Sequence, residues 1–93
     1  MPAEFLYGDC IILAPMMIEK LYQQLTSHFN TTPLKVAGRF VYYEKEFGVF
    51  ILAVHTAGAE RTQEVADVAW RSIPAKIKDR LSQVNIGFAV KQI

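Results

Sequence analysis

Apolar and polar residues follow two different spacings along this chain, and the spacings separate its helices from its strands. Residues 16–29 repeat apolar side chains every three or four positions, which predicts a half-buried helix that ends at Asn30. Residues 34–46 and 48–56 predict two strands joined as a hairpin, with Gly48 in a left-handed bulge position. Residues 84–92 alternate apolar and polar positions, and this alternation predicts a final half-buried strand.

Two further segments each contain or adjoin a proline. Residues 9–14 form a short apolar run rich in β-branched residues, and Pro15 can occupy the first turn of a helix without losing a needed hydrogen bond. We therefore predict a strand over 9–14. Residues 61–83 predict a second helix, in which Pro74 produces a kink or a break, with Ser72 capping a new segment. Its buried face consists of Val65, Ala69, Ile73, Ile77 and Leu81.

The element order is therefore βαββαβ, and it predicts an α+β, ferredoxin-like fold for a single domain spanning residues 1–93. In that fold a four-stranded antiparallel sheet carries both helices on one face. The strands over 9–14 and 48–56 take the central places, which agrees with their weak alternation.

The strand over 48–56 is apolar on both of its faces. Phe50, Leu52 and Val54 can pack on the helices, which leaves a second, open face that is too apolar to stay in water. If Gly48 is a bulge, Arg39 lies across from His55, although a slip of one residue would reverse the faces of the neighbouring strand. On this register, the residues expected to contact a partner or ligand are Arg39, Val41, Tyr43, Phe47, Val49, Ile51 and His55.

Composition narrows the classes of partner and compartment. The net charge of +1 argues against bulk electrostatic binding of nucleic acid or of an anionic membrane. Cys10 is the single cysteine, so no intrachain disulfide can form, and we expect a reducing, cytoplasmic location. The sequence has no signal-peptide pattern and no apolar run of membrane-spanning length, so we expect no membrane association.

The residues that could carry chemistry are few. His28 falls in the last turn of the first helix, where an imidazole suits the helix dipole. His55 ends a central strand and could act as an acid, a base or an anion-binding group beside Arg39, but no carboxylate can be placed near it. Asp9, Cys10 and the histidines lack the spacing of a metal site, so we expect neither a metal nor a cofactor.

Residues 45–52, "KEFGVFIL", resemble the third-strand signature of the RNA-recognition motif, because Lys45, Phe47 and Gly48 fall at matching places. The resemblance implies the same βαββαβ order and binding of single-stranded RNA. Val49 stands at the place where that family has a base-stacking aromatic residue.

Residues 54–90 resemble the strand, helix and strand of the tautomerase superfamily. The resemblance implies proton transfer without a cofactor, in which Pro2, freed by removal of Met1, is the catalytic base. Arg39 or Arg61 would then hold a carboxylate substrate.

Taken together, the patterns favour a small interaction or binding module that forms a homodimer or higher homo-oligomer through the open face of its sheet. An enzyme based on Pro2, with His55 and Arg39 as further candidates, is the first alternative, and an RNA-binding module is the second. The preferred hypothesis predicts that Ile51→Asp prevents association or ligand binding while the secondary structure is kept.

Overall fold

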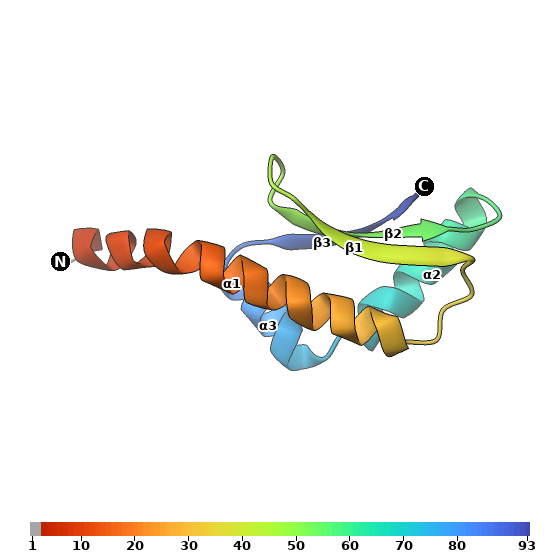
Figure 1. The fold of residues 1–93 in the computed structure, drawn as a ribbon, viewed down its shortest axis with the longest axis horizontal. Coiled ribbons are helices and arrows are strands. Elements are labelled where there is room, and N and C mark those ends of the chain that lie inside the picture. The colour runs from red at the N-terminus through yellow and green to blue at the C-terminus, as the bar shows by residue number, and fades with distance from the viewer. Residues whose placement is uncertain (1–2) are drawn as a thin grey trace.

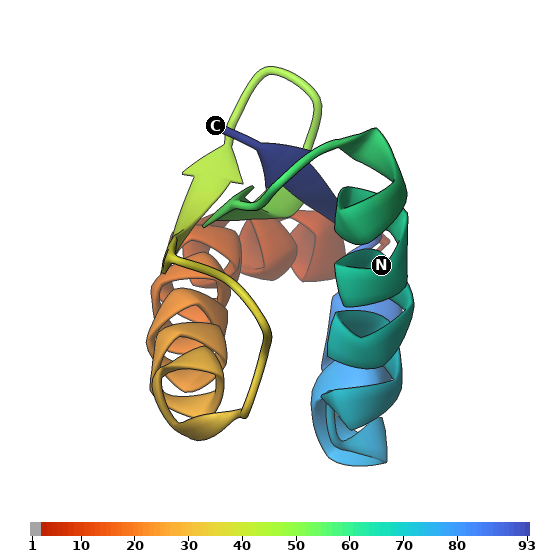
Figure 2. The same cartoon turned by 90° about the vertical axis from the view of Figure 1, so that its right-hand side faces the viewer.

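A three-stranded mixed sheet with three helices on one side makes up the fold (Figures 1 and 2). The computed structural model describes residues 3–93, with side chains described from Pro15 onward. Strands β1 and β2 are antiparallel, whereas β2 and β3 are parallel, so the sheet order is β1-β2-β3. The elements are α1 (Ala3–Thr31), β1 (Gly38–Glu44), β2 (Val49–His55), α2 (Ala59–Ser72), α3 (Ala75–Gln83) and β3 (Gly87–Gln92).

The core lies between the sheet and the three helices. From α1, side chains at intervals of four residues, Leu21, Leu25 and Phe29, are almost completely buried, as the helical spacing predicts. The face predicted for residues 61–83 is also buried, and the sheet contributes alternate residues of β1 and β2. The remaining core members are Val41, Phe50, Leu52, Val54, Val65, Ala69, Ile73, Ile77 and Leu81.

The predicted strand over residues 9–14 is wrong, because α1 is a single helix from Ala3 to Thr31 that includes these residues and continues through Pro15. A short apolar run has no periodicity that separates a strand from a helix. An interior proline removes one backbone hydrogen bond and crowds the preceding turn, yet α1 continues through Pro15. The α+β class is confirmed. The ferredoxin-like, four-stranded antiparallel sheet with two helices is wrong, and so is the fold implied by the resemblance to the RNA-recognition motif.

The predicted break near Pro74 is confirmed, and it divides the second predicted helix into α2 and α3. Ile73 adopts an extended conformation, with φ −68° and ψ 126°, because the ring of a proline disfavours helical geometry in the residue before it. Ser72 does not cap α3. Its hydroxyl instead donates to the carbonyl oxygen of Ala69, 2.7 Å away within α2.

The hairpin between β1 and β2 is confirmed, but its predicted register is wrong by one residue. Gly48 has the left-handed φ of +62° that its position in the sequence predicted. It is the last residue of a four-residue turn, and the ladder resumes directly with Glu44 opposite Val49. Gly38 therefore lies across from His55, and Arg39 lies across from Val54.

Candidate interaction face

The open face, as we call the face of the sheet opposite the helices, contains one residue in every two from each strand. The pairing places Phe40 beside Ala53, and Tyr42 beside Ile51, on this face. No helix or strand of residues 3–93 packs over it (Figures 1 and 2). Its residues are Gly38, Phe40, Tyr42 and Glu44 from β1, Val49, Ile51, Ala53 and His55 from β2, and Gly87, Ala89 and Lys91 from β3.

The centre of the open face is already covered by its own neighbours. Ile51 exposes 8% of its surface and Ala53 exposes 1%, because β2 is the central strand. Phe40, by contrast, is 52% exposed, and its ring lies 5.8 Å from the ring of Tyr42. The apolar surface that reaches solvent therefore comes mainly from the aromatic residues of β1. Ile51 is buried beside them and pairs with Tyr42 across the sheet.

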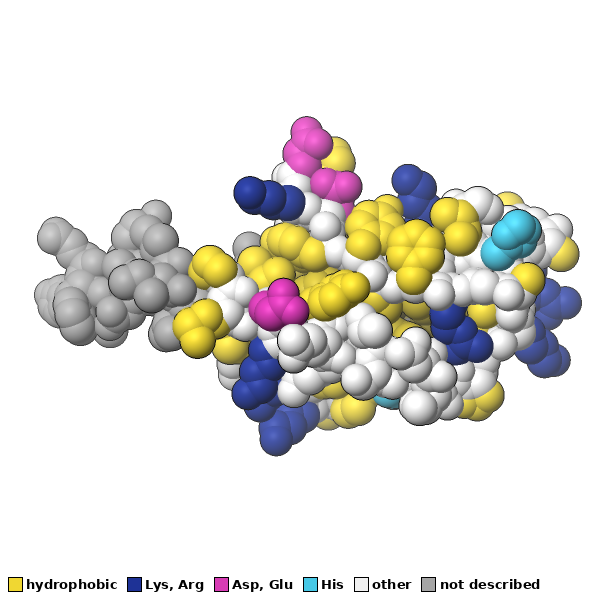
Figure 3. Space-filling view, viewed as in Figure 1, with side chains coloured by type: hydrophobic (Ala, Val, Ile, Leu, Met, Phe, Trp, Pro, Cys, Tyr) yellow, Lys and Arg dark blue, Asp and Glu magenta, His cyan; other side chains and the backbone are white. Residues whose placement is uncertain are grey.

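Charged and polar side chains lie at the two ends of the open face. Glu44 ends β1 at the hairpin, and Lys91 and His55 lie towards the other end of the sheet. Between these ends, hydrophobic side chains gather along the sheet (Figure 3). The hairpin projects away from the helices (Figures 1 and 2), and at its tip Phe47 is 77% exposed.

Three residues expected on the open face lie on the opposite, helix-facing side: Arg39, Val41 and Tyr43. Val41 is buried in the core, and Tyr43 packs against it with its ring 5.0 Å from that of Phe50. The cause is the one-residue change in register, which moves every side chain of β1 to the other face. Sequence analysis therefore missed Phe40 and Tyr42, although their alternation with Val41 and Tyr43 was visible.

Arg39 has a structural role at the end of α1. Its guanidinium donates to the carbonyl oxygen of Phe29 over 2.8 Å and also to that of Thr32. These carbonyl groups lie at the C-terminal end of the helix, where a positive charge interacts favourably with the negative end of the helix dipole. The side chain is therefore occupied in joining α1 to β1, and it lies away from His55.

His28 lies among hydroxyl groups that link α1 to the end of α2. Its Nε2 atom is 2.9 Å from Oγ of Ser72 and 3.2 Å from Oγ1 of Thr32. Both hydroxyls also donate to backbone carbonyls, that of Thr32 to His28 and that of Ser72 to Ala69. The histidine tautomer with hydrogen on Nε2 is the one that matches this arrangement, because that N–H can donate to the hydroxyl oxygens. Burial lowers the pKa of the imidazole.

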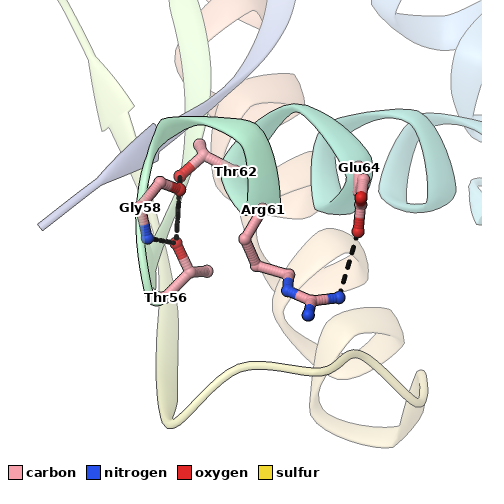
Figure 4. Close-up of polar contacts among 5 residues, drawn as sticks. All are labelled: Thr56, Gly58, Arg61, Thr62 and Glu64. Atoms are coloured by element: carbon pink, nitrogen blue, oxygen red, sulfur yellow. Dashed lines mark hydrogen bonds and ion pairs between the residues drawn. The ribbon is translucent and has the colours of Figure 1, made fainter.

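A polar cluster closes the start of α2 (Figure 4). Gly58, with φ +150°, precedes the helix, and its carbonyl oxygen accepts hydrogen bonds from the hydroxyls of Thr56 and Thr62. Arg61 points along the helix to Glu64, and the two form a 3.0 Å ion pair. The remaining candidate for holding a carboxylate substrate is thus already paired, although this pair is exposed and weak.

Pro2 lies outside the described residues, and so does the side chain of Cys10. Among the side chains that the structure describes, no three of His, Cys, Asp and Glu lie close enough to hold a metal ion. None of the described helices combines the length and the apolar character that crossing a membrane requires.

Comparison of this chain with family models, with curated proteins and with solved structures gives no match. The function must therefore be argued from the geometry.

Proposed function

We propose that this protein is a homo-oligomeric interaction module, in which a second copy of the chain covers the open face of the sheet. The observation that carries this proposal is the exposed ring of Phe40 beside the half-buried ring of Tyr42, on a face that no described helix or strand covers. Large aromatic residues with few rotatable bonds are the residues that most often anchor protein interfaces.

The size of the face sets the expected strength of association. Three strands about 4.8 Å apart, each about 23 Å long, give a footprint of roughly 320 Å². A typical stable interface buries about 800 Å² on each partner. The projecting hairpin tip adds the exposed side chain of Phe47, but the total remains below that standard size, as in weak and transient complexes. We therefore expect a reversible dimer with a micromolar dissociation constant.

Phe40 is the residue whose replacement tests the proposal. About half of its ring surface is exposed, so complete burial would remove roughly 100 Å² of apolar surface from water, which contributes about 2.5 kcal/mol. We expect Phe40→Asp to weaken self-association at least about 100-fold, because it also introduces a carboxylate into the contact. Size-exclusion chromatography with light-scattering detection, over a range of protein concentrations, measures this change.

Val68 provides the matched control. Its side chain is 47% exposed on α2, on the helical side of the molecule. Val68→Asp introduces the same charge at a similarly exposed apolar position, and we expect unchanged association. Equal effects of the two substitutions, or a wild-type protein that stays monomeric at high concentration, would contradict the proposal. Ile51→Asp is a poorer probe than the sequence suggested, because the buried position of Ile51 couples its replacement to folding.

A further inference from the structure

The two ends of the open face differ in charge, and this difference defines how two copies can meet. The hairpin end carries Glu44 and, in the turn that follows, Lys45 and Glu46, which together give a net charge of −1. The opposite end carries Lys91 and the exposed His55.

The charges at both ends of the face form no ion pair with another described side chain. Among the described residues the ion pair between Arg61 and Glu64 is the single one, so neither Glu44 nor Lys91 is neutralised by an opposite charge. One carboxylate oxygen of Glu44 accepts the backbone N–H of Glu46 over 3.1 Å, and this bond holds the carboxylate at the hairpin end.

A twofold axis can relate two stacked sheets in two ways. An axis parallel to the strands brings like ends together, and Glu44 of each copy then lies at the same end as Glu44 of the other. An axis across the strands brings opposite ends together, and the acidic hairpin end then lies over the basic end. Like charges at an interface disfavour association, whereas complementary charges stabilise it and fix its orientation.

We infer that the second copy lies antiparallel on the open face, with the acidic hairpin end of each protomer over the Lys91 and His55 end of the other. This inference rests on the proposed function and adds the orientation to it. The arrangement also places each projecting hairpin tip, with Phe47, over the far end of the partner's sheet.

A spin label on one copy and isotope label on the other distinguish the two orientations. The labelled variant carries Lys45→Cys, at an exposed position in the turn, and Cys10→Ser, which removes the native thiol. It is mixed with ¹⁵N-labelled wild-type protein at a concentration where light scattering shows a dimer. Because the face is about 23 Å long, its two ends can be told apart by the broadening of their amide signals.

The inference predicts broadening at Gly38, His55 and Lys91 of the isotope-labelled copy. Broadening at Val49 and Gly87 instead, or no broadening on this face while the dimer persists, would overturn the orientation. A protein that forms no dimer in light scattering would overturn the proposed function as well, so the two failures are distinguishable.

Charge exchange supplies an independent test. At low salt we expect Glu44→Lys to weaken self-association at least about five-fold, because it places like charges together in the antiparallel dimer. The double variant Glu44→Lys with Lys91→Glu should return the dissociation constant to within about two-fold of the wild-type value. Glu44→Gln keeps an acceptor for the N–H of Glu46, and its dissociation constant should lie between those of the wild type and of Glu44→Lys. A double variant as weak as the single one would contradict the inference.

Discussion

Polar side chains in and around the C-terminal part of α1 connect this helix to the rest of the molecule. Arg39 binds carbonyl groups at its end, and His28 contacts the hydroxyls of Thr32 and Ser72. Thr26 differs, because its buried hydroxyl oxygen has no hydrogen-bond partner among the described atoms. Of these contacts, the one between His28 and Ser72 joins residues 44 positions apart, and none of them was predictable from spacing alone.

Thr26 and Thr32 form a matched pair for measuring what a threonine hydroxyl contributes to the free energy of unfolding. Thr26→Val replaces an unpartnered buried hydroxyl with a methyl group of similar shape, so we expect it to raise the free energy of unfolding by about 1 kcal/mol. Thr32→Val removes the donor to the carbonyl oxygen of His28 and should lower it by about 1 kcal/mol. Urea denaturation measures both. The same sign for the two variants would contradict this account of the hydroxyls.

His28 should make stability dependent on pH. Because burial lowers its pKa in the folded protein below the ordinary value of 6.5, the unfolded chain binds the proton more readily. Above pH 6.5 the protonation of His28 therefore does not reduce the free energy of unfolding. This free energy falls as the pH drops below 6.5 towards the pKa of the folded state. We expect denaturation midpoints of wild type to fall between pH 7.5 and 5.5 by more than those of His28→Gln. Equal shifts in the two proteins would contradict this role of His28.

At the scale of elements, single residues correctly predicted the turn of the hairpin and the break between two helices. Gly48 permits a left-handed φ in the turn, and Pro74 disfavours helical geometry in the residue before it. The hairpin and the break between α2 and α3 were both predicted from such local effects. The run over residues 9–14 and the hairpin register were not predictable in the same way. A short apolar run fits a helix or a strand, and one residue in the turn decides which face of β1 meets the core.

Replacing two glycines tests whether the backbone conformation at Gly48 is what stabilises the turn. Gly38 begins β1, and Gly48 ends the turn that follows it. Gly48→Ala places a side chain at a φ of +62°, which should lower the free energy of unfolding by about 1 kcal/mol. Gly38→Ala is the control, because nothing lies within 4 Å of the added Cβ atom and its φ is not left-handed. We expect a change below about 0.5 kcal/mol there. Equal losses in urea denaturation would show that φ at Gly48 is not the cause.

At the scale of the whole molecule, three helices lie on one side of the sheet, and no described helix or strand covers the other side. The sequence predicted this apolar second face from the strand over 48–56. It could not place Phe40 and Tyr42 on that face, because their placement depends on the register of β1. Nor could it show that Ile51 is already covered, since that requires both neighbouring strands to be in place.

Intermolecular nuclear Overhauser contacts between an isotope-labelled and an unlabelled copy test the central claim most directly, because they report which side chains of two copies touch. The protein is measured at a concentration well above the expected micromolar dissociation constant. The account predicts contacts from the rings of Phe40 and Tyr42 and from the methyl group of Ala89 to protons of the second copy. Contacts confined to the helical side, or none at all, would contradict it.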